Sequence, residues 1–79
     1  MMDELQCARR ANLRLLLNEL RREGIACREA RARMLGIPAE EFGRIVRGAP
    51  VSDRLARDVE WAMNRPRGWL DRVTPDAIA

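Results

Sequence analysis

The chain contains no histidine and no tyrosine, and its only hydroxyl side chains are those of Ser52 and Thr74. Acid–base and nucleophilic catalysis often depend on such residues, and no glycine-rich phosphate-binding loop is present either. Cys7 and Cys27 are too few and too far apart for a zinc site, and no histidine can complete one. We therefore expect no enzymatic activity, no metal and no cofactor.

Aromatic residues are also scarce, with two Trp and one Phe in a chain that is 47% apolar. The core must therefore consist mainly of Leu, Ile, Val, Met and Ala, which suits helices better than strands. A chain of 79 residues is the size of one domain. We expect a single all-α domain over residues 1–79.

The sequence has neither a long apolar run nor a signal peptide. We expect a cytosolic protein without a membrane partner, in which thiols stay reduced. Cys7 and Cys27 then act as small, partly buried hydrophobic residues, although a disulfide between them is formally possible.

Lysine is absent, so all 15 basic residues are arginine, and together with 12 acidic residues they give a net charge of +3. Residues 9–33 carry eight arginines and three glutamates, whereas residues 34–79 are neutral overall. The positive charge is therefore concentrated in residues 9–33, the region of the first two expected helices. Arginine contacts phosphate and guanine through a bidentate fork that lysine cannot reproduce.

Apolar periodicity and helix-ending glycines predict four helices plus a short fifth. The first spans residues 3–23, the second 27–35, the third runs from Pro38 to just before Gly48, and the fourth is capped by Ser52. The stretch GWLD (68–71) forms at most one turn, and residues 73–79 form a tail. The expected core residues are Leu5, Ala8, Leu13, Leu16, Leu17, Leu20, Ala30, Met34, Leu35, Ala39, Phe42, Ile45, Val46, Leu55, Val59, Ala62 and Met63.

Two runs, ARMLGIPAEEFGRIVRG (32–48) and VSDRLARDVEWAMNRPRGWLD (51–71), carry a pattern of small and apolar residues at fixed spacings. Ala32 allows two helices to cross closely, Gly36 permits a tight turn, and Phe42 and Ile45 fix the angle between the helices. Such packing leaves the third helix standing out from the surface, although a plain helical bundle uses the same packing.

With the pairs Asn12-Leu13 and Val59-Glu60 and the ending GWLD, this pattern resembles the DNA-binding domain of lambda-repressor-like (XRE family) phage and bacterial regulators. The resemblance covers about residues 9–72. It implies a helix-turn-helix bundle that binds double-stranded DNA as a transcriptional regulator, most often a repressor. It also implies a place in the bacterial cytoplasm, at the nucleoid.

The resemblance also implies which residues face DNA. Arg28 would touch phosphate and Arg47 would lie near the DNA backbone. The exposed face of the third helix would consist of Ala39, Glu40, Gly43 and Arg44. Further candidates for phosphate contact, on the first two helices, are Arg9, Arg10, Arg31 and Arg33.

This sequence departs from the family at Ala39, Glu40 and Gly43, where Gln, Ser or Thr are usual, and at Arg31, which replaces an aliphatic residue. Three explanations stay open for the acidic residues in the first turn of the third expected helix. Glu40 can complement the helix dipole and pair with Arg44. It can accept a hydrogen bond from cytosine while the arginine reads guanine. The third helix can instead bind a protein, as in an antirepressor or an antitoxin-like adaptor.

An apolar surplus near the C-terminal end predicts a homodimer, because one domain of this size contacts a single half-site of DNA. The candidate interface residues are Trp61, Trp69, Leu70, Val73 and Ile78. The alternative is that the tail folds back over Trp61 within one chain.

Overall fold

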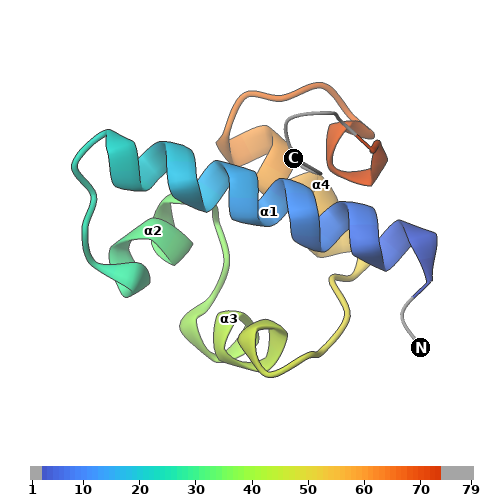
Figure 1. Ribbon diagram of the computed structural model, residues 1–79, viewed down its shortest axis with the longest axis horizontal. Helices are drawn as coiled ribbons and strands as arrows, with labels where there is room; N and C mark the ends of the chain where they lie inside the picture. Colours follow the sequence, from blue (N-terminus) through green and yellow to red (C-terminus); the bar gives the residue numbers. More distant parts are fainter. Residues whose placement is uncertain (1–2, 74–79) are drawn as a thin grey trace.

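Helix α1 (Glu4–Arg22) begins at Asp3, whose side chain accepts a hydrogen bond of 2.8 Å from the backbone N–H of Gln6. Arg21 and Arg22 in its last turn complement the negative end of the helix dipole. The computed structural model describes residues 3–73, and α1 is the longest element within them. Figure 1 shows α1 crossing the width of the molecule.

Helices α2 (Arg28–Met34) and α3 (Ala39–Val46) are joined by the tight turn at residues 35–38. Gly36 has a φ of +75°, which favours glycine at this position. Its N–H donates to the carbonyl of Arg33, and the N–H of Ile37 donates to the carbonyl of Ala32, both at 3.0 Å. This is a Schellman motif, and it redirects the chain within a few residues. The two helices are therefore joined by the tight turn that Gly36 predicts, and their assignment to a helix-turn-helix DNA-binding unit stays a prediction.

Helix α4 (Asp53–Ala62) is capped by Ser52, whose hydroxyl accepts a hydrogen bond of 3.1 Å from the N–H of Leu55. A single 3₁₀ turn, η1 (Trp69–Asp71), follows and packs against α1 and α4. The described residues thus form four α-helices and one short turn without any strand. The predicted all-α fold class is confirmed.

The Schellman pattern recurs at the ends of α1, α3 and α4. The residue in left-handed conformation is Gly24 after α1, Gly48 after α3 and Asn64 after α4. In each case the next N–H donates to a carbonyl five residues earlier, at distances of 2.7–3.1 Å. Each helix therefore satisfies its last carbonyls through its own backbone.

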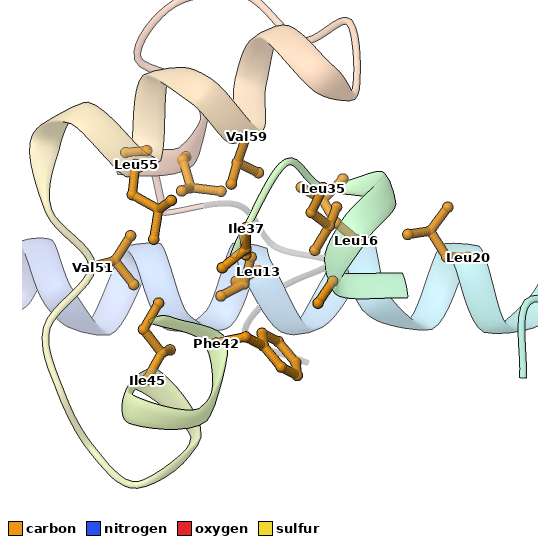
Figure 2. Packing of buried hydrophobic residues seen from close by; sticks show 13 residues of the cluster. Leu13, Leu16, Leu20, Leu35, Ile37, Phe42, Ile45, Val51, Leu55 and Val59 are labelled. Carbon is orange, nitrogen blue, oxygen red and sulfur yellow. The ribbon is translucent and has the colours of Figure 1, made fainter. Parts of the chain in front are cut away.

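The core is a single cluster of aliphatic side chains with one phenylalanine, and it draws on every element (Figure 2). Leu16 and Leu20 of α1, Leu35 after α2, and Val59 of α4 are 0–2% exposed. Phe42 and Ile45 point from α3 into this cluster and are each 6% exposed. The core thus holds α3 by one face only.

Several residues expected in the core lie on the surface instead. Met34 and Val46 are each 49% exposed, Leu5 is 39% exposed, and Ala39 and Ala62 are also exposed. A short helix buries only a narrow stripe, which Ala32 and Leu35 occupy in the region of α2 and which Phe42 and Ile45 occupy in α3. Side chains outside that stripe reach solvent.

The expectation that both cysteines are partly buried is wrong, because Cys7 and Cys27 are exposed free thiols. Cys7 lies on α1 roughly opposite Leu16, the buried side of the helix. Cys27 is the N-cap residue of α2, where its thiol donates to a carboxylate oxygen of Glu29 at 3.1 Å.

Arg9 was predicted to contact phosphate on the surface, but it is only 3% exposed. Its Nε donates to Oδ1 of Asp71 at 2.7 Å, and one Nη2 hydrogen bond of 2.8 Å reaches Asp53. Its Nη1 donates to the carbonyl of Val51 at 2.8 Å. One guanidinium thus joins α1 to η1 and to the loop before α4.

Two further buried polar side chains hold the backbone of the GWLD stretch. Asn12 Nδ2 donates to the carbonyls of Leu70 and Arg72, at 2.9 and 2.6 Å. The carboxylate of Glu60 accepts hydrogen bonds from the N–H groups of Gly68 and Leu70, at 3.0 and 2.8 Å. We call Arg9, Asn12, Glu60 and Asp71 the polar clasp. It satisfies the backbone polar groups of a segment whose Leu70 is completely buried.

The clasp makes stability depend on pH. The hydrogen bond from Arg9, followed by that from Arg57, holds the pKa of Asp71 below its usual value, although desolvation opposes this. A lowered folded pKa means that Asp71 stabilises the fold fully above its unfolded pKa of about 3.9. That contribution is lost as the pH falls through the lower folded value.

We predict that Asp71→Asn lowers the free energy of unfolding by about 2 kcal/mol at pH 7, because it removes a charged hydrogen-bond acceptor. The difference from the wild type should shrink as the pH falls from 5 toward 2. Urea unfolding across this range measures it. Asp53→Asn is the control, since Asp53 is 89% exposed and its loss should matter little. An unchanged difference at all pH values contradicts the assignment.

Candidate nucleic-acid interface

Helix α3 lies at an edge of the molecule, away from η1 (Figure 1). Because Phe42 and Ile45 face the core, the helical period turns the opposite face toward solvent. That outward face carries the exposed side chains of Glu40, Arg44 and Arg47. The structure thus brings together the third-helix residues that the sequence predicted, with exposed Ala39 at the start of the helix.

The charged side chains of this face have no ion-pair partner among the residues that the structure describes. No ion pair joins Glu40 to Arg44 within the described part of the chain, although their spacing predicts one. The carboxylate of Glu40 and the guanidinium groups of Arg44 and Arg47 are therefore available to a ligand.

Gly43 lies in the middle of this face and has no side chain. A Cβ atom at Gly43 would lie 3.8 Å from both Nη1 and Nη2 of Arg47, so that guanidinium lies over the glycine. Glycine within a helix costs stability relative to alanine.

The arginines expected to contact phosphate have different roles in the structure. Arg28 and Arg33 of α2 are exposed and fit the prediction. Arg9 is wrong as a phosphate contact, because its guanidinium is buried and bonded within the polar clasp. Arg9 lies four residues before Leu13, on the apolar stripe of α1, and that position was the available signal of burial.

Arg10 and Arg31 are half-buried and bind backbone carbonyls. Nη1 of Arg10 donates to the carbonyls of Ile45 and Ala49, at 2.9 and 3.2 Å, and so ties α1 to the end of α3. Nη1 of Arg31 donates to the carbonyls of Ile25 and Ala26, at 2.8 and 2.7 Å. Both arginines hold the frame around α2 and α3, and their contact with phosphate stays a prediction.

The candidate dimer interface is only partly retained. Trp61 is 87% exposed and Val73 is 66% exposed, as an interface requires. The assignment of Leu70 to this interface is wrong, because Leu70 is buried in the core of its own chain. Trp69 packs against the core, with the guanidinium carbon of Arg65 5.1 Å from its ring centre.

Ile78 lies outside the described residues, as do residues 74–79 of the tail expected to fold over Trp61 in the alternative. Pairing of two chains through Trp61 and Val73 stays a prediction.

Two further properties of residues 3–73 bear on this surface. No helix there has the length and apolar character needed to cross a bilayer. No group of three or more potential ligands, cysteine or carboxylate, is placed to hold a metal ion in the same part of the chain.

Comparisons with models of known protein families, with curated proteins and with solved structures gave no match. The membership of this chain in a lambda-repressor-like family therefore stays an expectation.

The glycine at position 43 within α3 leads to a prediction about stability. Gly43→Ala should raise the free energy of unfolding by about 0.5–1 kcal/mol, because alanine favours helix and its Cβ meets only ordinary contacts. Urea unfolding measures the change. Gly36→Ala is the matched control and should destabilise, since its φ of +75° disfavours alanine. A loss of stability in Gly43→Ala would mean that α3 has no room for the methyl group.

Proposed function

We propose that this protein is a DNA-binding transcriptional regulator that places α3 in the major groove. The observation that carries the proposal is the outward face of α3, where Glu40, Arg44 and Arg47 are unpaired around Gly43. A helix held by one face in a helix-turn-helix unit is suited to enter a groove about 12 Å wide. Eight residues give α3 a length of about 12 Å.

The surrounding charge supports contact with phosphate. Arg28 at the start of α2 and Arg33 near its end are exposed, in addition to Arg44 and Arg47. Phosphate contacts of this kind supply most of the affinity without reading sequence. The acidic residue on α3 then lowers affinity mainly where no base offers it a hydrogen bond.

Glu40 supplies the means of discrimination. A glutamate in the major groove accepts a hydrogen bond from N4 of cytosine, and an arginine donates to O6 and N7 of guanine. Glu40 and Arg44 have no bond to each other to break first. Glu40 and Arg44 can therefore recognise a cytosine and a nearby guanine from the same face of the helix.

Selection from a randomised duplex library, followed by anisotropy titration at two salt concentrations, tests the proposal. We expect submicromolar binding to an enriched sequence and weaker binding at higher salt, because arginine contacts release counterions. Arg44→Ala should weaken binding by about 5- to 150-fold, the equivalent of 1–3 kcal/mol. An enriched inverted repeat with half-sites about 10 base pairs apart would indicate that two chains bind together.

Arg67→Ala is the control for loss of one positive charge. Arg67 is exposed in the loop between α4 and η1. That loop lies on the other side of the molecule from α3 (Figure 1). Failure to enrich any sequence, together with the absence of salt-sensitive binding, would refute the proposal and leave α3 as a protein-binding surface.

The role of Glu40 has its own test. Glu40→Gln should change which base pair is preferred at one position, because an amide also donates hydrogen bonds. The difference in binding free energy between the base pairs at that position should change by about 1–3 kcal/mol. Glu41→Gln removes the same charge in the same turn. Glu41 lines the hollows between α3 and α4, so its substitution should leave base preference unchanged. Equal gains in affinity for all duplexes in both variants would show that Glu40 only complements the helix dipole.

A further inference from the structure

A groove of about 230 Å³ runs between α1 and α3, beside the outward face of α3. Leu13, Phe42 and Ile45 form its floor, and each is buried. Leu17 and Val46 form its apolar walls, and Val46 is 49% exposed. The apolar surface that a ligand can reach from solvent is therefore that of Val46 and the half-buried Leu17, above a floor of buried side chains.

The charges that line this groove all have one sign. Arg10 and Arg14 line it, and no carboxylate does. The guanidinium of Arg10 is fixed there by its hydrogen bonds to the carbonyls of Ile45 and Ala49. Arg14 is exposed and forms no ion pair within residues 3–73. Its charge is therefore free to act on a ligand.

Two other hollows adjoin α3, and they differ from this groove in charge. Both are lined by Glu41 together with arginine, and one also contains Asp58. The charges offset one another in the first hollow, and carboxylates outnumber arginine in the second. Among the three hollows, the groove between α1 and α3 combines an apolar floor with uncompensated positive charge.

We propose that this groove binds an acidic amphipathic helix of a protein partner. The apolar face of such a helix fills the floor, and its carboxylates meet Arg10 and Arg14. A nucleic acid offers phosphates but no aliphatic side chains for the floor. The volume is below the 300–1,000 Å³ typical of sites for drug-sized molecules and suits a few side chains.

The proposal goes beyond DNA binding and holds without it. Glu40, Arg44 and Arg47, which carry the proposed DNA contact, do not line the groove. Val46 and Arg47 are nonetheless consecutive, so a partner seated in the groove lies next to the proposed DNA surface. Occupancy by the partner is thus placed to influence contact with DNA.

Two designed helical peptides of equal length test the proposal on the full chain. Both carry leucine on one face, and the other face carries glutamate in the first and lysine in the second. We expect the glutamate peptide to bind at least tenfold more tightly in anisotropy titrations, because like charges at an interface are costly. Its amide shift changes in ¹⁵N spectra should centre on Leu13, Leu17 and Val46.

Substitutions at exposed positions separate the groove from other surfaces. Arg14→Glu and Val46→Glu should each weaken binding of the glutamate peptide at least tenfold, whereas Arg67→Glu, the matched charge reversal outside the groove, should not. Amide spectra show that the variants fold.

Equal binding of the lysine peptide, or binding that neither groove substitution affects, would overturn the proposal. So would a wild-type dimer in sedimentation that Val46→Glu dissociates, with no peptide binding, since a second copy would then fill the groove.

Discussion

The ion pair between Arg9 and Asp71 is the interaction on which the rest of the structure depends. A chain of 79 residues with one phenylalanine buries little apolar surface, and its last described turn has only Leu70 fully inside the core. Arg9 joins that turn to α1, and its Nη1 also holds the loop before α4 through the carbonyl of Val51. Arg10, the next residue, ties α1 to the end of α3. Two consecutive arginines of α1 therefore hold η1 and the end of α3 to the same helix.

Local signals in the sequence were enough to predict the helices. Asp3 and Ser52 supply caps, Gly24, Gly36 and Gly48 end helices, and the predicted bounds of the first three helices and the start of the fourth lie within about one residue of the observed ones. These signals act between neighbours in the chain, so they can be read without knowing the fold. The family resemblance implied which residues form the outward face of α3, and the inward positions of Phe42 and Ile45 account for that face through the helical period.

Contacts between distant segments could not be read in this way. Arg9 was expected to face phosphate because the positive charge is concentrated on the first two helices, although it occupies a position on the leucine stripe. Its partner lies 62 residues away. In the family pattern, Asn12, Glu60 and the GWLD stretch are separate features of the sequence. In the structure they bind one another, which gives a physical reason for their spacing.

The two tryptophans occupy opposite environments, and this gives the molecule two optical reporters. Trp69 packs against the core under the guanidinium of Arg65, whereas Trp61 is 87% exposed on α4. Because the chain has no tyrosine, its ultraviolet emission comes almost wholly from these two indoles. Emission from Trp69 reports whether η1 is docked, since release of the turn exposes that ring to water. Emission from Trp61 is already that of a hydrated indole, so it changes when another molecule covers the outer face of α4.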